Sequence, residues 1–387
     1  MKTCKISLRE LVTIQSGYSP STFQLKVTGN FPYVKVEDMN NCQKCQFESR
    51  EYTDDFNHIV PKGSIIFPKR GAAIMNNKVR IAARDLCMDT NMMAIIPNEK
   101  VLSEYLFYVI IHEQLYKIAD TSTIPQINNK HIYPYKIPLP SIAAQEKFVE
   151  LISTWDAAIE KTERLIAAKE KRYSWLSGGY LFGSNCHNAN TKKRTRWFSV
   201  PGHWKIVKVG SIAKEIKAIN ISGESIPVLS CTKYDGLVDS LTYFDKQVFS
   251  MDTSTYKVVS KSQFVYATNH IEEGSIGYQD LYDKGLVSPM YTVFETDESI
   301  HDGYLYKILK TAIYRHIFQV NTSASVDRRG SLRWNEFAKI PIPLPPMDNQ
   351  RKISAFLDTA RHEISLLKRQ ADAYCKQKRG LMQELLT

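Results

Sequence analysis

The sequence is poor in cysteine and has no long apolar run. Its seven cysteines among 387 residues are scattered and odd in number, so we expect no disulfide framework and favour a reducing compartment, the cytoplasm. Residues 1–11 carry several charged side chains, and no stretch of 18 apolar residues occurs in the chain. Secretion and insertion into a membrane are therefore both disfavoured.

Motifs for catalysis are also missing. The chain has no Asn- or Asp-Pro-Pro-aromatic motif for positioning an exocyclic amine, no Gly-rich cofactor loop after a strand and no Walker-type Gly-x-x-x-x-Gly-Lys-Ser/Thr. Methyl transfer and ATP hydrolysis are therefore not expected of this chain. Cys42 and Cys45 have the spacing of half a zinc site, but no second Cys pair or paired His follows at a usual distance. A metal site is not expected either.

Positive charge is in excess. Lys and Arg number 51 against 40 for Asp and Glu, which gives a formal net charge of +11. No basic amphipathic helix stands out, so the excess favours a polyanion, nucleic acid first, over a membrane surface. On charge alone, a merely soluble basic protein is an equally good interpretation.

The chain repeats itself at a period of about 200 residues. Ile137–Pro140, followed by Gln145, recurs as Ile342–Pro345, followed by Gln350, at an offset of 205 residues. Two upstream matches recur at an offset of 199, namely Gly63–Phe67 with Ser262–Tyr266 and Tyr105–Phe107 with Tyr304–Tyr306. The six extra residues of the second copy must fall between the two sets of matches.

Each copy has the same two parts, a segment of short β-type runs broken by Gly, Pro and Asn, and then a polar helix after the Pro-rich boundary. The predicted fold class is therefore α+β, with two β-rich domains that are each followed by a long helix. The predicted divisions are a first domain at 1–140, a central helix at 141–182, a linker at 183–200, a second domain at 201–345 and a C-terminal helix at 346–387. The linker is Asn-rich and basic, as is typical of such segments.

Both helices carry a heptad pattern. Seam positions alternate spacings of four and three residues from Phe148 to Leu176 and from Ile353 to Leu385, while charged residues occupy the other faces. The seam residues that we expect to pack are Ile152, Trp155, Ile159, Ile166, Leu357, Ile364, Leu367 and Leu381. Because each helix needs one partner, we expect the other helix to supply it. The alternative is that each helix lies on its own domain.

Several segments are similar to signatures of target-recognition domains. In the first copy these are Gly17–Pro20, Phe31–Val36 and Gly63–Pro68. In the second copy they are Trp204–Val209, Tyr256–Val259, Phe264–Tyr266, Gly274–Gly277 and Gly285–Phe294. Together with the two-copy organisation, they resemble the specificity subunits of type I restriction–modification enzymes along essentially the whole chain. The first copy departs at its opening, where Lys5–Leu8 has no Trp.

The resemblance implies two target-recognition domains separated by a long antiparallel coiled-coil helix pair, in a pseudo-two-fold repeat. Each domain would read half of an interrupted site in double-stranded DNA, and the helices would dock modification (methyltransferase) subunits, two in number. S-adenosylmethionine, ATP and Mg would be used by these chains and by the restriction (endonuclease) subunits. The chain itself would be a non-catalytic DNA-recognition subunit that binds no cofactor and no metal.

Polar residues in loops, with Lys and Arg beside them, are the candidates for DNA contact. In the first copy they are Tyr18, Lys69, Arg70, Asn76, Asn77, Lys78, Arg80, Ser122, Thr123, Gln126 and Asn128. In the second copy they are Lys233, Tyr234, Asn269, His270, Ser323, Arg328, Arg329 and Arg333. The adjacent Arg328 and Arg329, in a Ser-rich loop, are the best individual candidates. For any one of these residues, solvated surface charge is about as good an interpretation.

Two alternatives come from other functional classes. A repressor or architectural DNA-binding protein would use the same fold without catalytic partners, and copurification with a modification subunit distinguishes it from a specificity subunit. An enzyme with a nuclease centre is disfavoured because the chain has no Pro-Asp plus Glu-x-Lys cluster. Metal-dependent cleavage by the purified chain would revive that interpretation.

Overall fold

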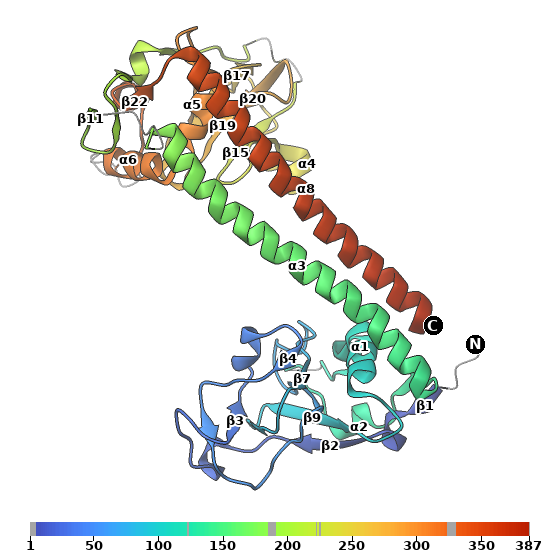
Figure 1. Cartoon of the computed structure of the whole chain (residues 1–387). Helices are drawn as coiled ribbons and strands as arrows, with labels where there is room; N and C mark the ends of the chain where they lie inside the picture. Colours follow the sequence, from blue (N-terminus) through green and yellow to red (C-terminus); the bar gives the residue numbers. More distant parts are fainter. Residues whose placement is uncertain are drawn as a thin grey trace. The chain divides into compact units, whose positions relative to one another are not determined.

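The computed structural model describes residues 5–121, 124–184, 191–221, 223, 226–322 and 330–386. The chain forms two compact units, Met1–Arg164 together with Lys368–Thr387, and Leu165–Leu367. Both combine helices with many short strands (Figure 1). Two long helices, α3 (Ile142–Leu181) and α8 (Met347–Leu386), contribute residues to both units.

The first unit is built on a five-stranded sheet with the strand order β2-β9-β6-β7-β4. Its strands are β2 (Val12–Ser16), β4 (Cys45–Gln46), β6 (Ile65–Pro68), β7 (Arg80–Ala82) and β9 (Met92–Pro97). The central strand β6 is buried along its whole length. Because successive side chains of a strand point to opposite faces, Ile65 and Phe67 enter one core cluster and Ile66 enters another.

Different elements cover the two faces of this sheet. Helix α1 (Ser103–Glu113) contributes six buried residues to the core that contains Ile65 and Phe67. The other core is shared with a three-stranded sheet of order β5-β3-β8, made of β3 (Phe31–Val34), β5 (Tyr52–Thr53) and β8 (Cys87–Met88). The unit also contains β1 (Lys5–Ser7), its partner β10 (Lys136–Pro138), the short α2 (Asn129–Ile132) and several short 3-10 helices.

The second unit contains a four-stranded sheet of order β14-β21-β18-β19. Its strands are β14 (Ala213–Ile216), β18 (Phe264–Ala267), β19 (Ile276–Tyr278) and β21 (Tyr291–Thr296). Two-stranded pairs join β13 (Lys205–Lys208) to β22 (Pro341–Leu344), β15 (Leu229–Thr232) to β16 (Gly236–Asp239), and β17 (Lys257–Ser260) to β20 (Lys284–Val287). Besides its parts of α3 and α8, the α-helices of this unit are α4 (Ser240–Phe244), α5 (Asp302–Leu309), α6 (Ala312–Thr322) and α7 (Trp334–Phe337).

The two units share one topology. The order β2-β9-β6-β7 of the first matches β14-β21-β18-β19 of the second, and the β1–β10 pair matches β13–β22. The repeated tyrosines make the same bond, because the hydroxyl of Tyr105 donates to the carbonyl of Pro138 at 2.9 Å and that of Tyr304 to Pro343 at 3.2 Å. The predicted α+β fold with a two-copy repeat is confirmed.

The repeated glutamine has a structural task at the start of each long helix. Gln145 is fully buried on α3. Its side-chain oxygen accepts a hydrogen bond from the amide of Leu102 at 2.8 Å, and its nitrogen donates to the carbonyls of Lys100 at 3.1 Å and Pro140 at 3.0 Å. One side chain thus fastens α3 to the segment that leads into α1.

Gln350 forms the same clamp on α8. It accepts from the amide of His301 at 2.7 Å and donates to the carbonyls of Ser299 at 3.3 Å and Pro345 at 2.9 Å. Every partner is the repeat equivalent of a partner of Gln145. The glutamine clamp therefore fixes each domain to the helix that follows it.

The long helices pair in opposite directions. Within the first unit, Trp155 near the start of α3 packs against Tyr374 near the end of α8, with ring centroids 5.7 Å apart. Within the second unit, Lys169 near the end of α3 forms an ion pair of 2.6 Å with Glu363 in the first half of α8. The start of one helix meets the end of the other in both places, so the pairing is antiparallel. In the described residues, we find no helix with both the length and the apolar character to cross a bilayer.

Side chains at the expected seam positions have low exposure. Ile152, Leu357 and Ile364 are buried, and Trp155, Ile159, Ile166, Leu367 and Leu381 are partly buried. The end of the pattern differs from the expectation, because Leu385 is 45% exposed whereas Met382 and Leu386 are buried. Those two residues pack into the core of the first unit with α1. The last turn of α8 therefore follows the domain surface and not the heptad.

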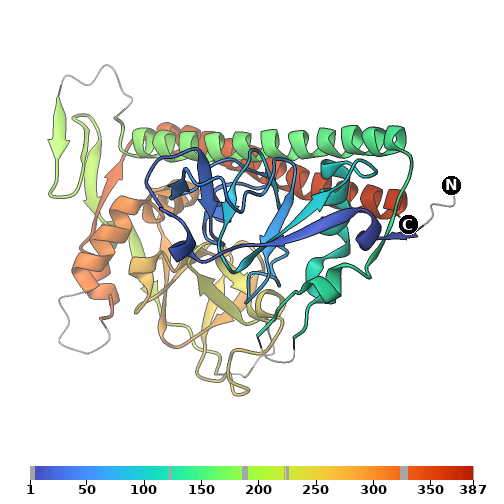
Figure 2. The same cartoon turned by 90° about the horizontal axis from the view of Figure 1, so that it is seen from below.

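Part of the segment expected to be a linker is structured. Strands β11 (Lys192–Arg194) and β12 (Ser199–Pro201) form a hairpin that lies beside α6 in both views (Figure 1 and Figure 2). Phe198 and Val200 are buried in the core of the second unit, where the ring of Phe198 stacks on Tyr314 with centroids 6.2 Å apart. This hairpin is part of the second unit's core.

Candidate nucleic-acid interface

Two of the candidate loops of the first unit are joined by their backbones. The amide of Ile127 donates to the carbonyl of Lys69 at 2.9 Å, and Arg70 and Gln126 form an isolated β-bridge. Gly71 has a φ of +82°, a conformation that favours glycine, so the chain can turn sharply just after β6. Residues that are more than fifty positions apart in the sequence thus meet at the C-terminal end of β6.

A third segment lies against these loops, the turn Asp89–Asn91 between β8 and β9. The carbonyl of Asn91 accepts a hydrogen bond from the amide of Lys69 at 2.8 Å, and the carboxylate of Asp89 accepts from the amide and the side chain of Asn91, both at 2.9 Å. Tyr18 pairs with Asp89 as an isolated bridge, and its ring stacks on His58 with centroids 3.7 Å apart. Tyr18, Lys69 and Gln126 therefore share one end of the sheet.

Positive charge and hydrogen-bonding groups coincide at this end. Arg70 is exposed, whereas Lys69 is partly buried, and burial together with the charge of Arg70 lowers the pKa of Lys69. Gln126 is partly buried, and Asn128 and Asn91 are exposed. Cations of this kind neutralise phosphates, and amide groups donate to and accept from the edges of bases.

Three other candidates have their polar groups engaged inside the first unit. Asn77 donates to the carbonyl of Ile111 on α1 at 3.0 Å, and Lys78 donates to the side chain of Asn40 at 2.6 Å. The guanidinium of Arg80 donates to carbonyls in the segment 39–42. These bonds hold the fold together, so Asn77, Lys78 and Arg80 are weaker candidates for DNA contact than Arg70 and the exposed Asn76.

The second unit repeats the loop junction. The amide of Leu332 donates to the carbonyl of Thr268 at 2.8 Å, and these residues are the repeat equivalents of Ile127 and Lys69. Leu332 and Ile127 are both fully buried, so in each copy one apolar side chain anchors the second loop. Asn269, at the position of Arg70, is partly buried at the C-terminal end of β18.

The turn of the first unit also has its equivalent, Ser288–Met290. The hydroxyl of Thr268 donates to the carbonyl of Met290 at 3.0 Å, and the amide of Met290 donates to the side chain of Ser288 at 3.3 Å. Met290 is 62% exposed, which is unusual for a large apolar side chain among polar loops. An apolar group here suits contact with the methyl group of thymine.

Two exposed residues of these turns, Asn91 and Met290, were not among the predicted contacts, and neither was His58. Strand β8 has only two residues, so no alternation of apolar side chains marks the turn that follows it. The available signal was Ser-Pro-Met between two apolar runs in the second copy, at 288–290. The repeat offset of 199 residues places the equivalent turn of the first copy at Asp89–Asn91, so this turn could also have been predicted.

Further candidates of the second unit lie on separate loops. Lys233 and Tyr234 lie between β15 and β16, where the Lys233 ammonium is 5.3 Å from the centroid of the Tyr234 ring and Tyr234 is 72% exposed. Arg333 is exposed immediately before α7. Of the predicted contacts, Ser122, Thr123, Ser323, Arg328 and Arg329 lie outside the described residues.

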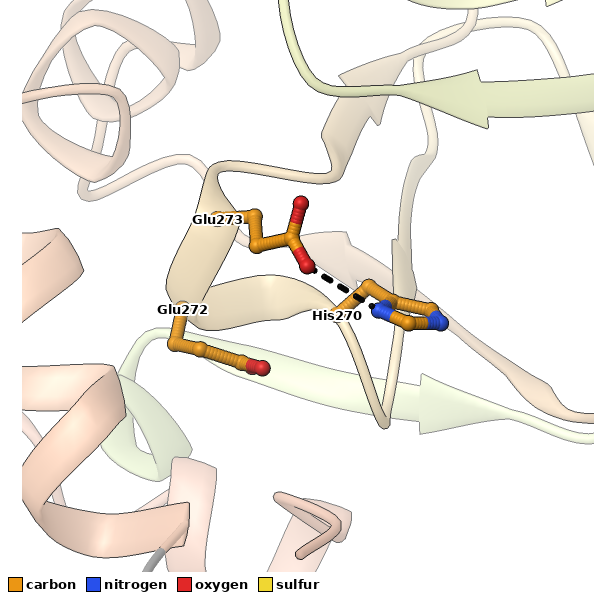
Figure 3. A group of neighbouring side chains, drawn as sticks. All are labelled: His270, Glu272 and Glu273. Carbon is orange, nitrogen blue, oxygen red and sulfur yellow. Dashed lines mark hydrogen bonds and ion pairs between the residues drawn. The ribbon is translucent and has the colours of Figure 1, made fainter. Parts of the chain in front are cut away.

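His270 lies next to two acidic residues on one short turn (Figure 3). His270, Glu272 and Glu273 belong to or adjoin the 3-10 helix η6 (Ile271–Glu273), and their nitrogen and oxygen ligand atoms lie within 4.8 Å of one another. The His270 ring is 3.4 Å from the Glu273 carboxylate. Because all three come from one turn and two are exposed, we assign no metal to them. Carboxylates at this place can accept hydrogen bonds from cytosine.

Both copies of the repeat match the model of one protein family. The model of the type I restriction modification DNA specificity domain matches residues 2–170 and again residues 201–373. The chain belongs to this family. Each match covers one domain together with most of the long helix that follows it.

Relatives in this family are specificity subunits of type I restriction enzymes. The chain is 27% identical over 227 residues to the MjaIX subunit of Methanocaldococcus jannaschii, a match that covers 54% of this chain and 50% of that protein. It is 23% identical over 186 residues to the EcoR124I/EcoR124II subunit of Escherichia coli, covering 44% and 46%. These matches span about half the length of each relative. A putative MjaX subunit of M. jannaschii is 21% identical over 97% of this chain and 91% of its own.

Solved structures of this family have the same fold. The S subunit of a type I restriction-modification system from M. genitalium aligns with a TM-score of 0.59 at 14% sequence identity, over all of this chain and 96% of that one. A chain from a study of complex assembly and conformational transition of the type I R-M system aligns with a TM-score of 0.60 at 16% identity, over all of this chain and 98% of that one. At such low identity the likeness concerns the fold alone.

Proposed function

We propose that the chain is a sequence-specific DNA-binding specificity subunit of a type I restriction–modification complex. It recognises an interrupted, two-part site, one half with each domain. The observation that carries this proposal is the loop junction common to both copies, from Ile127 to Lys69 and from Leu332 to Thr268. A protein that reads two half-sites needs the same kind of polar face twice.

The composition of the two faces supports DNA as the ligand. Each combines cations, such as Arg70 in the first unit and Lys233 and Arg333 in the second, with side chains that donate and accept hydrogen bonds. Cations supply affinity through phosphate neutralisation, whereas Asn, Gln and Arg distinguish base pairs in the major groove. The net charge of +11 favours encounter with DNA at long range.

Catalysis belongs to partner chains in this proposal. Two modification subunits use S-adenosylmethionine to methylate the site, and restriction subunits use ATP and Mg to cleave DNA. The chain directs both to the DNA without reacting itself, in the cytoplasm where the DNA lies. The names of the relatives, which are specificity subunits, support this assignment.

Methylation mapping tests the proposal. The chain is expressed with its modification subunits in cells without other DNA methylation, and the methylated positions are sequenced. We expect one motif made of two constant halves and a gap of constant length. Cells with the modification subunits alone should show no such motif. Methylation of the same positions without this chain would contradict the proposal.

Exchange of one domain refines the same test. Replacing residues 1–136 by the equivalent segment of a relative should change one half of the motif, because each copy has its own sheet and loops. The other half and the gap should stay the same. A change in both halves would show that the domains do not read independently.

A further inference from the structure

Lys310 joins two loops of the second unit that carry candidate DNA contacts. It lies at the C-terminal end of α5. Its ammonium donates to the carbonyls of Lys233 at 3.0 Å, Gly274 at 2.9 Å and Ile276 at 3.4 Å. An ammonium group has three N–H donors, and here each has a backbone acceptor. The first acceptor is in the Lys233–Tyr234 loop, and the second ends the turn that begins at His270.

The same loops approach each other and α5 closely at this point. A Cβ on Gly274, which has a φ of +102°, would lie 3.5 Å from the carbonyl oxygen of Lys233. A Cβ on Gly236, at the other end of the Lys233 loop, would lie 2.3 Å from the hydroxyl of Tyr306 on α5. Backbone segments this close have few alternative positions as long as their hydrogen bonds hold. Lys310 supplies those bonds.

Burying the ammonium group of Lys310 costs desolvation free energy, which hydrogen bonds or nearby charges must offset. Burial lowers the pKa of Lys310, and the nearby charge of Asp235 opposes this shift only in part. The carbonyls and the negative end of the α5 dipole offset part of the cost. An apolar side chain could fill the space but would leave these three carbonyls without the donor that Lys310 supplies, so the task of the lysine lies in holding the loops.

Comparison of the copies supports this point. The residue 199 positions before Lys310 is Ile111, which cannot donate from its side chain. In the first copy the loop is the donor and the helix the acceptor, because the side chain of Asn77 donates to the carbonyl of Ile111 on α1. In the second copy the helix residue Lys310 is the donor. The shared topology is therefore compatible with other residues at this position, and lysine belongs to the particular loops of the second domain.

We propose that Lys310 is a positioning residue for base recognition by the second domain. It acts through the loops that carry Lys233, Tyr234 and His270 and does not itself touch the DNA. Loops held in place before binding lose less conformational freedom when DNA arrives, and they distinguish correct from incorrect bases more sharply. This inference rests on the proposed function, since it assigns a task within the same recognition face.

The test compares Lys310→Met with Lys307→Met in the complex with modification subunits. Lys307 is a matched control, because it is also on α5 but binds Ser354 and Asp358 of α8, at 3.0 and 2.8 Å. Dissociation constants are measured for duplexes with single base changes in each half of the mapped motif. Lys310→Met should reduce discrimination on the order of 5- to 10-fold in the half read by the second domain and leave the other half unchanged.

Two further variants separate positioning from general stability. Lys310→Arg keeps a cation with several donors and should restore most of the discrimination, whereas Lys310→Gln should give an intermediate result even if the Met variant folds poorly. Lys307→Met should lower the thermal stability of the protein without affecting base discrimination. Equal discrimination by the wild type and all Lys310 variants would overturn the inference. A wild type that discriminates at neither half would instead contradict the proposed function.

Discussion

Arg70 and Asn269 occupy equivalent positions in the two copies, two residues after the end of β6 and of β18. Arginine pairs well with guanine and asparagine with adenine, because each can form two hydrogen bonds to one base edge in the major groove. One position with two different side chains is what a protein needs if its two domains read different sequences on one scaffold.

Replacing Arg70 by Ala tests this at the residue scale. If Arg70 reads a base, the variant should lose about 1–3 kcal/mol of binding free energy and relax the preference at one base pair of the first half-site. If it contacts a phosphate, all sequences should weaken alike, and the slope of log K against log salt should fall by about one unit. Binding measured against salt concentration on a set of altered duplexes distinguishes the two.

Arg9 is the control for this measurement. It is exposed and precedes β2, whose first residue pairs with Pro97, at the end of the sheet opposite to the loops. Arg9→Ala should leave affinity and salt slope within error of the wild type. If Arg70→Ala also leaves affinity and salt slope unchanged, the Arg70 loop does not contact DNA.

At the scale of elements, the glutamine clamp ties each domain to its long helix. Gln145→Ala should destabilise the start of α1 by at least about 2 kcal/mol, because each buried group left without a partner costs about 1–3 kcal/mol. Native-state hydrogen exchange at the amide of Leu102, which donates to Gln145, measures this locally. Glu146→Ala, at the next and exposed position, should change exchange little. If the amide of Leu102 exchanges equally slowly in both variants, Gln145 does not hold α1 to α3 as proposed.

Helices and repeat were predictable because their signals are local or recur at a fixed offset. An α-helix has 3.6 residues per turn, so residues at heptad spacing, such as Ile152 and Ile166, fall on one face of the helix without any knowledge of the tertiary structure. Strands β4, β5 and β8 have two residues each, too few for an alternating pattern. The prediction that the seam continues to Leu385 was wrong. Met382 and Leu386 pack into the core of the first unit instead, and the heptad pattern carries no information about that core.

The candidate site was predictable as a set of loops, but not as a surface. Gly and Pro mark the loops around Arg70 and Gln126, whereas the bridge between these two residues is a tertiary contact. Lys78 and Arg80 look like exposed cations in the sequence because their partners are near residue 40. Lys310 had no signal at all, since a lysine at the end of a helix is common on protein surfaces.

At the scale of the whole molecule, both points at which the chain passes between its two units lie inside helices. The passages are at Arg164–Leu165 in α3 and at Leu367–Lys368 in α8. Each helix has 40 residues, which at 1.5 Å per residue corresponds to about 60 Å. A pair of continuous helices is stiffer than a loop linker, so we expect the gap between half-sites to depend on helix length.

Lengthening both helices at these passages tests that expectation without altering the contacts inside either unit. Duplicating residues 158–164 and 361–367 adds one heptad to each helix and keeps the seam in phase. The insertion adds about 10 Å, equivalent to roughly 3 base pairs at 3.4 Å each. Because every base pair also rotates the DNA by about a tenth of a turn, the fit will be imperfect, and we expect weaker methylation at sites whose gap is longer by about 1–3 base pairs.

The control is an insertion of two residues at the same two places, which turns the seam beyond each insertion by about 200° at 3.6 residues per turn and should abolish methylation by disrupting the pairing of the helices. Mapping of methylated sites gives the gap directly for each variant. Both half-sites should keep their sequences in the heptad variant, because neither sheet nor loop has changed. An active heptad variant that keeps the original gap would show that the modification subunits or the DNA itself, and not α3 and α8, set the distance.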